Sequence, residues 1–98
     1  MTTRVLTFSG DVLRLNVSTG ASGRVRVEVQ DTQGRPLPGY GLEDCHPLVG
    51  DSIEMPVRWK AREDVHALQG QPVKLLIEMH DADLYSWGTV PANQLKKR

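Results

Sequence analysis

The sequence alternates apolar and polar residues with a period of two, most clearly in RVRVEVQ at positions 24–30. In this run Val25, Val27 and Val29 point to one side, and charged or amide side chains point to the other. Successive side chains of a strand lie on opposite faces of a sheet, so this period indicates a strand with one buried face. Runs at 12–18, 53–60 and 73–80 follow the same pattern, and no long stretch has helical periodicity. The chain is therefore predicted to be all-β.

The inward positions of these runs define the expected hydrophobic core. Trp59 shares its parity with Val57, which favours burial of the indole over a place on a binding surface. Pro56 lacks a ladder donor, so its strand is expected at a sheet edge or with a bulge. The predicted core comprises Val25, Val27, Val29, Val57, Trp59, Leu75 and Ile77.

Turn-forming residues separate the runs and set the expected number of strands. Gly, Asp and Ser cluster at 9–11, 19–23, 31–34 and 80–83, and each cluster is expected to reverse the chain. Weaker strands are expected at Arg4–Ser9 and Leu84–Thr89, and one short helical turn within 61–72. The predicted fold is an antiparallel, jelly-roll-like β-sandwich of about six to eight strands.

Length and charge restrict the classes of protein to which the chain can belong. Its 98 residues fit one domain, expected at 1–88 and followed by a polar tail at 89–98. The formal net charge is zero, which argues against nucleic-acid and membrane partners. With Cys45 as its single cysteine, the chain cannot form an internal disulfide. No apolar run is long enough for a signal peptide or a membrane span, so we expect a soluble chain whose localisation stays unknown.

The loop GYGLEDCHPLVGDS, at 39–52, gathers most of the residues that could form a polar site. Glu43, Asp44 and Asp51 offer the oxygen ligands that calcium prefers, although their spacing matches no compact calcium loop. The favoured interpretation is structural, with two glycines as hinges and two aspartates as acceptors for backbone N–H groups. These loop residues are Gly39, Asp44, Gly50 and Asp51. Cys45 and His46 are adjacent in sequence and should point in different directions, which argues against a shared site.

Exposed aromatic rings would be needed for a sugar-binding surface. Tyr40 follows Pro38 and Gly39 and is the best single candidate for an exposed ring. Tyr85 and Trp87 share a parity, so they lie either on the inner face of the last strand, which is favoured, or on the outer face as an exposed aromatic pair. The candidate carbohydrate-binding residues, if these rings are exposed, are Tyr40, Tyr85 and Trp87. No set of residues has the pattern of a catalytic acid–base pair, an activated nucleophile or a phosphate-binding loop, so we predict no enzymatic activity for this chain.

Several concatenated stretches resemble one family of domains. They are RVEVQDTQGRPLPGY at 26–40, LEDCHPLVGDS at 42–52, VRW at 57–59, PVKL at 72–75 and DADLYSW at 81–87. Together they resemble the C-terminal β-sandwich domain of bacterial glycoside hydrolase-like proteins, in which it follows a five-bladed propeller of the invertase or arabinanase type. The likeness covers about residues 3–88.

The resemblance implies a noncatalytic accessory module, because the catalytic carboxylates of such proteins belong to the propeller. It implies an adjacent propeller domain or a second copy as partner, and an exposed apolar patch where that partner sits. The alternative is a carbohydrate-binding module that uses exposed aromatic rings, with a structural calcium as the one cofactor considered.

Overall fold

A computed structural model describes residues 2–60 and 64–90. Within these residues the chain is all-β, as predicted, with strands β1 (Val12–Gln30), β2 (Asp51–Pro56) and β3 (Lys74–Val90). Two short 3₁₀ helices, η1 (Leu42–Asp44) and η2 (His66–Leu68), interrupt the connecting loops. The strands form one antiparallel sheet in the order β2-β1-β3. The described residues thus contain three strands, and the expectation of about six to eight is wrong.

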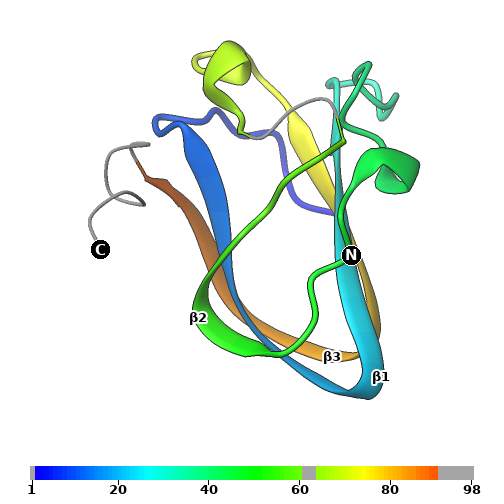
Figure 1. The fold of residues 1–98 in the computed structure, drawn as a ribbon. Coiled ribbons are helices and arrows are strands. Elements are labelled where there is room, and N and C mark those ends of the chain that lie inside the picture. The colour runs from blue at the N-terminus through cyan, green and yellow to red at the C-terminus, as the bar shows by residue number, and fades with distance from the viewer. Residues whose placement is uncertain (1, 61–63, 91–98) are drawn as a thin grey trace.

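The number of strands is lower because runs that were expected to be separate strands belong to one continuous strand. The runs at 12–18 and 24–30 both belong to β1, and the runs at 73–80 and 84–89 both belong to β3. β1 and β3 stay paired along nearly their whole length and bend sharply together, so that two halves of the same sheet face each other (Figure 1). The clusters at 19–23 and 80–83 therefore bend paired strands and do not reverse the chain.

The residues at the bend show why glycine and aspartate occur there. Pairing slips between Thr19 and Arg24, where four β1 residues lie opposite Asp81 alone. Asp81 has a φ of 50°, the only positive φ among the described non-glycine residues, and aspartate tolerates this conformation better than most residues. A Cβ atom on Gly20 would overlap the Asp81 carboxylate, and one on Gly23 would overlap the Asp81 carbonyl oxygen. The missing Cβ atoms let the two backbones approach closely at the bend.

The core lies between the two halves of the sheet and beneath the loops that cover them. All seven of the core positions expected from the alternation are at most 1% exposed. Loop residues complete this core, namely Phe8, Tyr40, Cys45, Leu48, Val65 and Leu68. Both 3₁₀ helices lie at the end of the molecule away from the bend (Figure 1).

Irregular segments pair with both edges of the sheet, and one of them includes the weak strand expected at Arg4–Ser9. The N-terminal segment follows the start of β3, with Leu6 and Val73 exchanging two backbone hydrogen bonds of 2.8 Å. On the opposite edge, Val29 of β1 donates to the carbonyl of Tyr40 and accepts from the N–H of Leu37, both at 2.9 Å. β2 is an edge strand that ends at Pro56, as the missing donor of that proline requires.

The C-terminal end of the sheet and the burial of Glu28 both differ from what the sequence predicts. Thr89 and Val90 of the expected tail belong to β3 and pair with β1, while 91–98 lie outside the described residues. Glu28 belongs to the side of the run 24–30 that was expected to face outward, but it is 8% exposed and accepts a hydrogen bond of 2.7 Å from Gln30. Its other carboxylate oxygen accepts the N–H of Leu42 at 3.2 Å, which fixes the start of η1.

Candidate functional site

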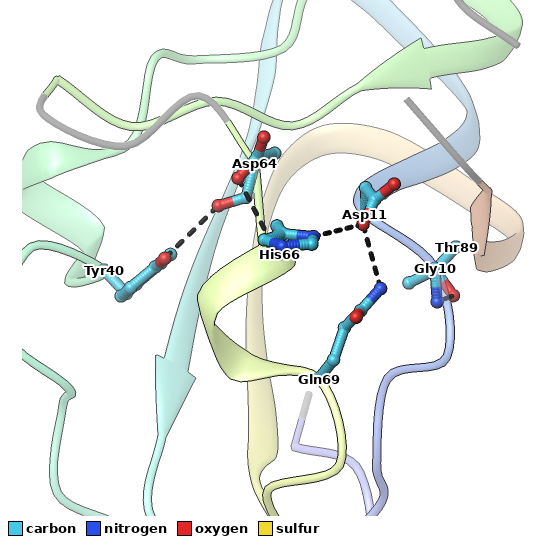
Figure 2. A network of polar contacts seen from close by, with 7 residues as sticks. All are labelled: Gly10, Asp11, Tyr40, Asp64, His66, Gln69 and Thr89. Carbon is cyan, nitrogen blue, oxygen red and sulfur yellow. Dashed lines mark hydrogen bonds and ion pairs between the residues drawn. The ribbon is translucent and has the colours of Figure 1, made fainter. Parts of the chain in front are cut away.

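A network of polar side chains joins the start of β1 to the η2 region (Figure 2). His66 Nδ1 lies 2.5 Å from Asp11 Oδ1, and Gln69 Nε2 donates to the same oxygen at 2.9 Å. The backbone N–H of His66 donates to Asp64 Oδ1 at 3.2 Å. The carbonyl of Asp11 also accepts the Val65 N–H at 2.7 Å. The network thus ties η2 to the segment that enters β1.

The electrostatics of this network favour a protonated imidazole. The hydrogen bond and the charge of Asp11 raise the pKa of His66 above its ordinary value of 6.5, and the charge of Asp64 adds to this effect. The His66 side chain is 68% exposed, so solvent screens the pair. A carboxylate that orients an imidazole is one half of an acid–base apparatus, and a nucleophile would complete it. Within 2–60 and 64–90, His66 makes no hydrogen bond to a hydroxyl or thiol side chain.

Tyr40 lies inside the molecule, contrary to the expectation of an exposed ring. It is 3% exposed, and its ring packs edge-to-face on Trp59 with centroids 5.0 Å apart and an angle of 70° between the planes. Gly39 has a φ of 86°, which directs the chain back so that Tyr40 joins β1 and the core. The Tyr40 hydroxyl donates to the carbonyl of Asp64 at 3.2 Å. The ring therefore supports the core and cannot form a sugar-stacking surface.

Tyr85 and Trp87 do not share a face, contrary to their parity in the sequence. Asn16 pairs with Ser86 and Val17 pairs with Leu84, so Tyr85 is the extra residue of a β-bulge. The bulge shifts the alternation by one position, since side chains alternate with a period of exactly two residues. Leu84 and Trp87 consequently both pack against the core, whereas Tyr85 is 65% exposed. The expectation that Tyr85 faces inward is wrong.

The bulge creates an apolar depression on the surface of β3, with a volume of about 440 Å³. It is lined by Met79, Leu84, Tyr85 and Trp87, together with Ser86, and we name this surface the β3 patch. Met79 is 40% exposed and is, with Tyr85, one of the exposed large hydrophobic residues. The sequence analysis named Tyr85 and Trp87 as candidates, but it did not predict Met79 and Leu84 beside them or the bulge that exposes Tyr85.

The structure describes the side chains of two of the three loop acids. Glu43 and Asp44 lie in η1, and the side chain of Asp51 lies outside the described residues. No group of three or more His, Cys, Asp or Glu side chains with metal-binding geometry occurs in that part. Gly39 and Gly50 have φ values of 86° and 107°, which makes both of them turn positions.

Cys45 and His46 point apart, as expected. Cys45 is buried, and burial raises the pKa of its thiol. Its Sγ accepts a hydrogen bond of 3.3 Å from the N–H of Val27 in β1. His46 lies on the exposed side of the same segment. The thiol is therefore a structural acceptor of the sheet.

The Asp11–His66 pair is the polar contact that sequence reasoning missed. The two residues lie 55 positions apart, and the sequence gives no spacing that would connect them. Comparison of the chain with protein-family models, curated proteins and solved structures found no match. In the described residues, no helix has the length and apolar character needed to cross a membrane.

Proposed function

We propose that this chain is a noncatalytic accessory module of a glycoside hydrolase-like protein, and that it acts through the β3 patch. The observation that carries the proposal is the exposure of Tyr85 and Met79 beside the half-buried Leu84 and Trp87. Contiguous exposed apolar surface of this kind marks protein contact sites more often than isolated apolar residues do. The partner is an adjacent five-bladed propeller domain or a second copy of the chain.

The position of the patch on an edge strand supports an interface. β3 is the edge of the sheet on this side, and the described residues of the N-terminal segment pair with it at Val73, Leu75 and Leu76. The patch lies farther along β3, beyond that cover. Exposed edge strands are commonly shielded by charge, proline or a covering element. A partner that seats on the β3 patch would cover both its apolar side chains and the neighbouring edge.

Binding measurements on two matched variants test the proposal. In one, Met79→Ser and Tyr85→Ser are combined; in the other, Val5→Ser replaces an exposed valine outside the patch. Sedimentation velocity is recorded for each protein alone and with a five-bladed propeller domain encoded by the same genome. We expect the wild type and the Val5 variant to associate with themselves or with the propeller, and the double variant to lose that association at least tenfold. Association that is absent in the wild type, or unchanged in the double variant, would refute the interface.

The second candidate is a carbohydrate-binding module, which the 65% exposure of the Tyr85 ring favours. An exposed ring with polar neighbours such as Ser86 can stack on the apolar face of a sugar. A glycan array with the wild type and Tyr85→Ala distinguishes the candidates. Sugar binding that Tyr85→Ala abolishes, in a protein that does not associate, supports the module. A calcium ion held by Glu43, Asp44 and Asp51 stays a prediction, tested by calorimetric titration with calcium chloride.

A further inference from the structure

A second surface, formed by two short antiparallel segments, carries basic side chains that have no ion-pair partner among the described residues. The N–H of His46 donates to the carbonyl of Arg58 at 2.9 Å, and the N–H of Lys60 donates to the carbonyl of Asp44 at 2.7 Å. Between these bonds Cys45 and Trp59 form a bridge and are both buried. Because side chains alternate along extended segments, His46, Arg58 and Lys60 lie on the exposed side.

These three side chains line one depression of about 280 Å³, together with an edge of Trp59. Within the described residues none of the three makes an ion pair or a side-chain hydrogen bond. Other arginines of the chain do pair, as Arg26 does with Glu78 at 2.6 Å. Asp44 would be the natural partner of Lys60, but its carboxylate is directed back towards the start of η1 and lies 3.7 Å from a Cβ built on Gly41. The depression therefore offers cations that no carboxylate of the described residues neutralises.

A second depression of about 270 Å³ borders the first and shares His46 and Arg58 with it. Its other lining residues are apolar, namely Pro47, Leu48, Val49, Met55 and Pro56. Val49 is 59% exposed, the second most exposed large hydrophobic residue after Tyr85. A ligand that fills both depressions must present negative charge next to an apolar group.

We propose that these two depressions, which we name the His46 cleft, bind a short acidic and apolar peptide segment of a partner protein. Carboxylates of the segment pair with Arg58 and Lys60, and an apolar side chain packs against the side of the cleft formed by Pro47 and Val49. A sugar acid fits less well, because Trp59 is 1% exposed and offers no ring face for stacking. The proposal goes beyond the β3 patch, since it places a second contact on different segments of the chain.

The net charge of the chain determines the range over which an acidic segment is attracted to the cleft. The chain has a formal net charge of zero, so attraction to an acidic segment comes from the local cations and not from a long-range field. The contact should therefore weaken as salt rises, because exposed charges are screened within about 8 Å at an ionic strength of about 0.15 M. We expect weak binding, with a dissociation constant on the order of 1 mM.

A nuclear magnetic resonance titration tests the His46 cleft. The ¹⁵N-labelled chain is titrated with an acetylated and amidated peptide of sequence Glu-Val-Glu-Leu, and with the peptide in which glutamine replaces glutamate. We expect the acidic peptide to shift the amides of His46, Arg58 and Lys60, to bind at least fivefold more weakly at 0.3 M salt, and to lose its effect in the glutamine form. Equal shifts with both peptides would overturn the proposal.

Variants connect the shifts to the proposed cations. Arg58→Gln with Lys60→Gln should weaken binding at least fivefold, whereas Arg24→Gln changes an exposed arginine outside the cleft and should leave binding unchanged. Unchanged binding in the double variant, or tighter binding of sodium glucuronate to the same amides, would overturn the peptide proposal. Tyr85→Ser should retain peptide binding, which separates this test from that of the β3 patch.

Discussion

Replacing Trp59 by phenylalanine should cost more than the loss of ring size alone. The indole Nε1 donates a hydrogen bond of 2.9 Å to the carbonyl of Val27, in a part of β1 where irregular segments, not a strand, adjoin the edge. Both residues are at most 1% exposed, so water cannot readily replace the lost donor. Phenylalanine keeps an aromatic ring at the site but leaves the Val27 carbonyl without that partner.

The structure gives the expected size of the effect. An unsatisfied buried acceptor costs about 1–3 kcal/mol. The smaller ring also gives up apolar burial, at about 0.8 kcal/mol for each CH₂-sized group removed. Trp59→Phe should therefore lower the free energy of unfolding by roughly 2–4 kcal/mol, a large part of the 5–15 kcal/mol typical of a domain.

Urea unfolding followed by far-ultraviolet circular dichroism measures this change, because the substitution removes a fluorophore but not the strands. Tyr40→Phe is the matched control, since it keeps the edge-to-face ring pair and removes the partly buried hydroxyl bond to Asp64. That variant should lose about 0.5–1.5 kcal/mol. If Trp59→Phe loses no more stability than Tyr40→Phe, with equal denaturant slopes, the bond to Val27 does not support the edge of β1.

Three further predictions concern pH, the bend and the thiol. Asp11 raises the pKa of His66, so their pair stabilises the fold fully below about pH 6.5 and loses this effect as pH rises through the folded-state pKa of His66. Urea unfolding from about pH 5.5 to 8.5 should show that decline in the wild type and not in His66→Gln. Gly23→Ala should destabilise by more than about 1 kcal/mol, because its Cβ would meet backbone across the bend, whereas Gly88→Ala, with open space, should stay within about 0.5 kcal/mol in the same assay. Burial raises the pKa of the Cys45 thiol, so a maleimide should label it at least tenfold more slowly in native protein than in urea, and equal rates would contradict its burial.

The sequence was informative where structure depends on near neighbours. Alternation identified the buried positions of β1 and β3, since a period of two fixes which side of a strand faces the core. Val25 and Ile77, for example, are both fully buried. On the outward side of the same strands, Arg26 and Glu78 are direct partners in the register of β1 and β3 and form an ion pair. These inferences require only that a strand forms.

Inferences that depend on the path of the backbone were less accurate. Glycine and aspartate clusters indicate a change of direction, but they do not say whether the chain reverses or a paired ribbon bends. At 19–23 the deciding contact is the approach of Asp81, about sixty residues away in a strand that local sequence cannot place beside β1. The same limit explains Tyr85, because one inserted residue exchanges the inner and outer faces of everything that follows it.

Side chains and loop backbones supply the hydrogen-bond partners that additional strands would have supplied to the edge of β1. A sandwich of about six to eight strands would pair the edge of β1 with another strand. Here the N–H of Val27 donates to the Cys45 thiol and its carbonyl accepts from the Trp59 indole, while Val25 and Val29 bond to the backbones of Leu48, Leu37 and Tyr40. Backbone groups that are buried must find partners, but those partners need not belong to a regular strand. The loop at 39–52 therefore closes the sheet with inward residues such as Cys45 and Leu48, while His46 lies on its exposed side and lines the proposed cleft.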